Sequence, residues 1–161
     1  MMRQWTKYLV IPCLLLTITA CGSKPASHEH EAHQLANGDI QETTKSVQVL
    51  PSFLDKKDPQ MKQIYQLAAS HADLLQWIPC YCGCGESAGH QSNQNCFVKE
   101  IRQDGSVVWD DHGTRCNVCL EIAVYSVKMK QEGKTDKEIR SFIDSKYQKG
   151  YASPTKTPMP A

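Results

Sequence analysis

Strong charge of one sign is missing from this sequence. Lysine and arginine together number 18, aspartate and glutamate 17, and the formal net charge is +1 at pH 7. Such a balance gives no electrostatic argument for binding the phosphate backbone of a nucleic acid. We therefore expect no nucleic-acid partner.

A hydrophobic run long enough to span a membrane is also missing from the N-terminus. The apolar stretch from Leu9 to Ile18 is short of the roughly 20 apolar residues that a spanning helix needs. It follows the basic residues Arg3 and Lys7 and precedes small residues before Cys21. A basic start, a short apolar core and small residues before a cleavage point indicate a signal peptide, here residues 1–20.

The residues before Cys21 fit a lipobox, so they resemble the site that lipoprotein signal peptidase reads. Cleavage there would leave Cys21 to carry acyl chains such as palmitate, and stable anchoring needs more than one chain. We expect an extracytoplasmic lipoprotein anchored to the cell membrane through Cys21. The alternative is an ordinary secretory signal with a chance cysteine.

Two segments are poor in the large apolar side chains that form a core, or rich in proline. Residues 21–48 are predicted to be a lipidated, disordered tether, and residues 152–161 a disordered tail. Residues 49–151 remain as one small cysteine-rich domain, which a disulfide or metal would help to stabilise. The tether histidines, which could bind divalent ions loosely or simply be solvated, are His28, His30 and His33.

Apolar residues at helical spacing predict three helices. They are expected over 59–76, over 116–131, and between a capping box at Thr135 and the closing Gly150. Asp104-Gly105 between two apolar runs predicts a β-hairpin. The expected fold is mainly α, a small three-helix domain with a cysteine-rich loop and a short β-hairpin.

Six of the eight cysteines remain once Cys13 has left with the signal and Cys21 is lipidated: Cys80, Cys82, Cys84, Cys96, Cys116 and Cys119. Disulfides among the first three would close very small, strained rings. Thiols flanked by glycines could instead converge on one ion, and thiolates favour Cu(I), Zn(II) or iron–sulfur clusters.

The Cys116-x-x-Cys119 pair has two common uses at the start of a helix. It could supply two metal ligands, or it could be a redox pair in which Arg115 and the helix N-terminus lower a thiol pKa. Leu120, not histidine, follows Cys119, so attachment of a c-type haem is not expected.

Two histidines, His90 and His112, could complete a coordination shell, or they could be turn residues bonded to the backbone. Cys96 could be a further ligand or a buried thiol. This donor set exceeds the four ligands of one tetrahedral zinc, and the surplus suits two ions or a small thiolate-bridged Cu(I) cluster. We therefore expect Cu(I) as the first choice of metal and zinc as the second. The predicted protein is a non-enzymatic metallochaperone, buffer or sensor; thiol–disulfide exchange and a disulfide-stapled interaction domain are the alternatives.

The run Pro79-Cys80-Tyr81-Cys82-Gly83-Cys84 resembles the PCYCGC-motif lipoproteins of bacteria. The resemblance continues through Gly89-His90, Cys96-Phe97 and His112-Gly113 to Cys116-x-x-Cys119, and it covers residues 60–150. It implies the domain boundaries more than a particular chemistry.

The segment from Arg115 to Tyr147 is similar to the cytochrome c maturation subunit that carries an Arg-Cys-x-x-Cys motif. That family is a membrane-anchored thiol–disulfide partner of apocytochrome, and the resemblance implies Cys116 and Cys119 as the redox pair. The sequence lacks the Gln-Asn that follows the second cysteine in that family, and it adds the cysteines at 80–84. A protein partner that exchanges either metal or disulfides with this chain is compatible with both interpretations.

Overall fold

The computed structural model describes residues 31–161, and every element below belongs to that part of the chain. In chain order these are β1 (Glu31–Gln34), β2 (Ile40–Thr44), the 3₁₀ turn η1 (Ser52–Leu54), α1 (Pro59–Ser70), α2 (Ala72–Leu75), α3 (Gly85–Ala88), η2 (Asn93–Cys96), β3 (Val98–Ile101), β4 (Val107–Asp110), η3 (Asp111–Arg115), α4 (Asn117–Gln131) and α5 (Asp136–Tyr147). The predicted signal peptide, Cys21, His28 and His30 lie outside the described residues.

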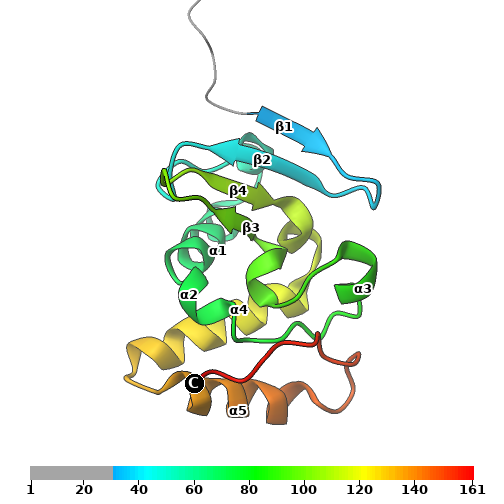
Figure 1. The fold of residues 1–161 in the computed structure, drawn as a ribbon, viewed down its shortest axis with the longest axis vertical. Helices are drawn as coiled ribbons and strands as arrows, with labels where there is room; N and C mark the ends of the chain where they lie inside the picture. Colours follow the sequence, from blue (N-terminus) through cyan, green and yellow to red (C-terminus); the bar gives the residue numbers. More distant parts are fainter. Residues whose placement is uncertain (1–30) are drawn as a thin grey trace, which may run out of the picture.

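The described residues form a mixed α/β fold. The four strands make one antiparallel sheet in the order β1-β2-β4-β3. In Figure 1 the sheet lies at the top, α5 at the bottom, and α4 between them. The expectation of a mainly α, three-helix domain is therefore wrong, since it contained the β3–β4 hairpin but neither β1 nor β2.

Strand β2 escaped prediction because its buried side chains are polar. Glu42 is buried and accepts hydrogen bonds from the backbone N–H of Ser52 at 2.6 Å and from the Ser52 hydroxyl at 2.8 Å. Gln41 Nε2 donates to Asp110 Oδ2 at 2.9 Å. A buried polar group with a partner avoids the cost of desolvation, so the strand needs no apolar alternation. The expected tether is thus a pair of strands over part of its length.

The local capping and turn signals were sound. Asp58 caps α1 by accepting from the backbone N–H of Met61, and Thr135 and Glu138 form the expected capping box of α5. Gly105 has a φ of +85°, as the hairpin turn requires. The helix expected over 59–76 is divided into α1 and α2 at His71.

The tail at 152–161 has no helix or strand, yet it is docked on the domain. The backbone N–H of Thr155 donates to the Cys80 carbonyl at 3.0 Å, and the Thr155 hydroxyl accepts from the Cys80 N–H at 2.9 Å. Arg140 Nη1 donates to the carbonyls of Thr157 at 3.2 Å and Pro158 at 2.8 Å. The tail that was expected to be disordered thus makes several hydrogen bonds to the domain without large apolar side chains.

The aromatic core lies beneath the sheet and fixes the base of the site. Tyr65 of α1 packs edge-on against Phe97, with ring centroids 5.2 Å apart, and both are buried. The Tyr65 hydroxyl donates to the Asp110 carbonyl at 2.9 Å. This bond joins α1 to the end of β4, where η3 begins and leads to the second cysteine pair.

Candidate metal centre

The cysteine-rich loop leaves α2 through Pro79 and is held from both sides. Thr155 pairs with both backbone polar groups of Cys80, and the Ile78 carbonyl accepts from the Asn93 N–H at 2.7 Å. Gly83 turns the chain with a φ of +82°, and a Cβ at Gly85 would meet Thr155 Cγ2 at 2.6 Å. The two glycines thus allow the turn and the close approach of the tail that set the thiols in place.

Five sulfur atoms form one connected cluster. Cys80 Sγ lies 3.1 Å from Cys82 Sγ, 3.4 Å from Cys119 Sγ and 3.7 Å from Cys96 Sγ. Cys119 Sγ in turn lies 2.6 Å from Cys116 Sγ. All are free thiols. The structure therefore brings Cys80, Cys82, Cys96, Cys116 and Cys119, which sequence reasoning named from separate segments, to a single place.

Helix α4 contributes the second pair through its N-terminus. Cys116 is the N-cap residue, and its Sγ accepts from the backbone N–H of Cys119 at 3.3 Å. The backbone N–H of Cys84 donates to Cys82 Sγ at the same distance. Hydrogen bonds of this kind favour the thiolate over the thiol, and thiolates are the metal-binding form.

Cys84 lies at the periphery of the thiol cluster, next to Cys82. Its Sγ lies 3.9 Å from the Cys82 carbonyl oxygen, and it belongs to none of the metal-binding groups found within residues 31–161. Cys84 supplies a backbone donor to Cys82 Sγ, and burial and the neighbouring Cys82 raise the pKa of its own thiol.

The neighbouring thiols perturb one another strongly. Hydrogen bonds from Cys116, Cys119 and Cys80 hold the pKa of Cys82 far below its usual range. The bond with Cys119, then that with Cys80, lowers the pKa of buried Cys96. Hydrogen bonds to Cys116, Cys80 and Cys82 raise the pKa of Cys119. Some thiols of the cluster are therefore favoured as thiolates and their neighbours as protonated thiols. A bound cation would stabilise the thiolate form of the protonated thiols as well.

Two groups of described side chains have their ligand atoms within 4.8 Å of one another at the sulfur cluster. One is Cys80, Cys96 and Cys119, all buried; the other is Cys82, His112 and Cys119. Cys119 is common to both, so one thiolate is placed to bridge two ions. The bond to Cys82 raises the pKa of His112 to about 9.

The two candidate histidines lie side by side at the edge of the cluster. Their ring centroids are 4.7 Å apart, and His90 Nδ1 is 3.6 Å from Cys96 Sγ. His112 Nδ1 faces the carboxylate of Asp39 at 3.2 Å. Sequence reasoning missed Asp39 because it was assigned to the tether. The signal for it was Asn37-Gly38-Asp39, whose Asn-Gly pair is a hairpin turn.

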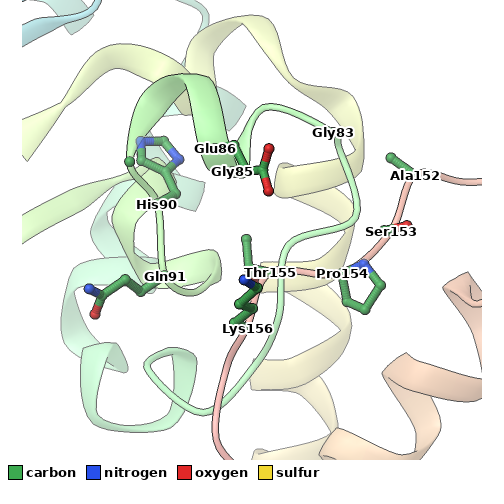
Figure 2. A pocket seen from close by; sticks show the side chains of 11 residues that line it. Gly83, Gly85, Glu86, His90, Gln91, Ala152, Ser153, Pro154, Thr155 and Lys156 are labelled. Carbon is green, nitrogen blue, oxygen red and sulfur yellow. The ribbon is translucent and has the colours of Figure 1, made fainter.

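A cavity of about 850 Å³ lies beside the centre, between the glycine-rich loop and the tail. Figure 2 shows His90 and Glu86 on one side of it and Thr155 with Pro154 on another. His33, the tether histidine within the described residues, is exposed on β1 and is not among these lining residues.

Residues 10–160 match the model of a protein family described as proteins of unknown function with a PCYCGC motif. The chain belongs to this family. The PCYCGC-motif assignment made from the residues is therefore confirmed, and the motif itself supplies the first two sulfurs of the cluster. No curated protein and no solved structure gives a significant match, so the resemblance to the cytochrome c maturation subunit is unconfirmed.

Within residues 31–161, no helix is both long enough and apolar enough to cross a bilayer.

Proposed function

We propose that this PCYCGC-motif protein is an extracytoplasmic lipoprotein that binds a soft metal ion through its clustered cysteines, as a metallochaperone, buffer or sensor. The main support for this proposal is that five free cysteine sulfurs from three separate segments form one connected cluster. Soft thiolates at such spacing are the donors that Cu(I) and Zn(II) prefer. No chemical step of an enzyme is required of them.

Copper(I) is the first choice of ion because the donors outnumber one tetrahedral shell. Five sulfurs exceed the four ligands of a structural zinc site, whereas thiolate bridges let a small Cu(I) cluster use all of them. Cys119, which takes part in both sulfur-containing groups, is the natural bridge. Zinc is the second choice, bound by four of the same thiolates.

The burial of the five thiols is suited to an ion that is shielded from solvent but can still be transferred to another protein. Cys80, Cys96 and Cys119 are buried, whereas Cys82 and Cys116 are partly exposed. The inner sulfurs would exclude water and oxidant from the ion, and the outer pair would be the first thiols that a donor or acceptor protein could reach.

The test is anaerobic titration of the full chain, in detergent, with Cu(I) against a chromogenic chelator. Cys119→Ser is expected to lower Cu(I) affinity by at least about 100-fold, since removal of supporting groups alone costs up to that much. Cys84→Ser is the matched control, because Cys84 belongs to neither of the groups whose ligand atoms converge around Cys119. Equal losses in the two variants, or no Cu(I) binding by the wild-type chain, would reject the proposal.

Thiol–disulfide exchange by Cys116 and Cys119 is the second candidate. It is favoured by the 2.6 Å separation of the two sulfurs at the start of α4. Thiol counting after equilibration in glutathione buffers separates the candidates. One reversible pair that turns over substrate disulfides supports exchange, whereas ultraviolet thiolate-to-copper bands with all thiols reduced support binding.

The membrane anchor is a separate part of the proposal, supported by the sequence around Cys21. Cys21→Ala is expected to abolish incorporation of labelled palmitate and to keep the signal peptide attached. A palmitate-labelled Cys21→Ala chain would contradict lipidation at this residue.

A further inference from the structure

Beside the sulfur cluster, three nitrogen- and oxygen-donor side chains converge from segments far apart in the sequence. Asp39 comes from the β1–β2 turn, His90 from the loop after α3 and His112 from η3. One ligand atom of each lies within 4.8 Å of those of the other two. Asp39 is 3% exposed and His90 7%, and the His112 side chain is 12% exposed.

We propose that Asp39, His90 and His112 form a second metal site, distinct from the thiolates, that takes a divalent cation of borderline hardness such as Zn²⁺. Imidazole and carboxylate suit such ions, whereas Cu(I) favours sulfur. Two histidines and a carboxylate are a common protein ligand set for zinc, with a fourth position left to water or another ligand. The site does not require the thiolates to carry copper.

One of the three side chains has a buried nitrogen without a partner. His90 Nε2 is buried and has no hydrogen-bond partner among the residues that the structure describes. The other ring nitrogen, Nδ1, is 3.6 Å from Cys96 Sγ. A buried polar atom without a partner is costly in a folded protein, and a metal ion is one of the groups that can satisfy it.

Excess negative charge at the same place favours a cation. Asp39, Asp110 and Asp111 are all buried, and they have carboxylate oxygens within 4.8 Å of one another. Arg115 pairs with Asp39 and Asp111. His112 also faces Asp39. Three ionised carboxylates against one guanidinium and one imidazolium still leave one negative charge, and burying such charge without compensation is unfavourable.

The Asp39 carboxylate is already held in a ligand-like orientation. Arg115 Nη2 donates to its Oδ1, while Asn37 Nδ2 donates to Oδ2 at 2.7 Å. His112 Nδ1 lies 3.2 Å from that same Oδ2. A cation would take the place of the proton between this nitrogen and oxygen, and the proton would leave to solvent. Arg115 and Asn37 would remain as the outer hydrogen bonds that orient a metal-bound carboxylate.

The experiment uses the full chain with His28, His30 and His33 replaced by glutamine, so that tether imidazoles do not compete. The chain is first saturated anaerobically with Cu(I) and then titrated with Co²⁺, a spectroscopic substitute for Zn²⁺. We expect one Co²⁺ per chain, with visible ligand-field bands but without the near-ultraviolet sulfur-to-cobalt charge-transfer band. In Asp39→Asn, this cobalt is lost while the Cu(I) capacity is unchanged, and His90→Gln also loses the cobalt.

The matched controls are His71→Gln and Asp104→Asn. The His71 ring binds the Leu67 carbonyl on α1, and Asp104 lies in the exposed β3–β4 turn. Both should retain the cobalt. No Co²⁺ binding after copper loading, or cobalt retained in both site variants, would overturn the proposal. If Asp39→Asn does not fold by circular dichroism, His90→Gln alone decides.

Failure of this site and failure of the thiolate site remain distinguishable. A chain that takes no Cu(I) is titrated directly with Co²⁺, and sensitivity of the ligand-field bands to His90→Gln still supports the nitrogen–oxygen site. Loss of cobalt binding with intact Cu(I) binding rejects only the second site.

Discussion

Replacing Thr155 with valine removes one hydroxyl and leaves the shape of the side chain nearly unchanged. That oxygen accepts from the backbone N–H of Cys80 at 2.9 Å and lies 2.8 Å from the Thr157 hydroxyl. Without it, the Cys80 N–H is left without an acceptor beneath the tail. An unsatisfied buried donor costs about 1–3 kcal/mol, so we expect a loss of about 2 kcal/mol in the free energy of unfolding.

The assay is urea denaturation of the reduced, metal-free chain, followed by tryptophan fluorescence. With a urea dependence of about 1.5 kcal/mol per molar, a loss of about 2 kcal/mol lowers the midpoint by roughly 1 M. Thr155→Ser is the control, because it keeps the oxygen and removes only the methyl group. It should lose less than half as much stability as Thr155→Val.

The same variants bear on the metal centre, because the Cys80 sulfur contacts those of Cys82, Cys119 and Cys96. Thr155→Val should speed the release of Cu(I) to a chelator, whereas Thr155→Ser should not. A Thr155→Val chain with a wild-type urea midpoint and a wild-type release rate would refute the argument that the tail holds the cysteine loop.

Three further outcomes are expected. Arg140→Met removes the donor to the tail carbonyls and should accelerate tryptic cleavage after Lys156, measured by mass spectrometry. Gly113→Ala places a Cβ at 2.7 Å from Phe97 Cε1 and 2.9 Å from the Cys96 carbonyl, so it should destabilise by about 1–3 kcal/mol in thermal unfolding. Saturation with Cu(I) at 1,000 times its dissociation constant should stabilise the chain by about 4 kcal/mol, seen as a higher melting temperature.

Local signals in the sequence were enough to place the helices that carry the thiols. The Asp58 cap and the Thr135 capping box depend on side chains within three residues of the backbone they bind, so they can be recognised without the fold. The hairpin turn at Gly105 is equally local. The grouping of the cysteines could be predicted from their chemistry. Disulfides between cysteines so close in sequence would be strained, whereas their thiolates can bind a common soft ion.

Long-range polar contacts could not be predicted in the same way. Buried Glu42 has both its oxygens bound by Ser52, and Gln41 donates to Asp110. Low hydrophobicity therefore indicated disorder where the fold has a central strand. Misplacing this strand also concealed Asp39, which the β1–β2 turn carries 73 residues in sequence from its partner His112.

The position of Asp39 changes what the cysteine spacing means. Cysteine patterns alone suggested that His90 and His112 complete a thiolate shell, but both rings also border a pocket of buried carboxylates. His112 belongs to two groups, with Cys82 and Cys119 on one side and Asp39 on the other. Because imidazole has two nitrogens, one ring can connect a sulfur site to an oxygen site. Occupancy of either site would then affect the other through His112. His112→Gln should weaken both sites, whereas Asp39→Asn should weaken the nitrogen–oxygen site alone.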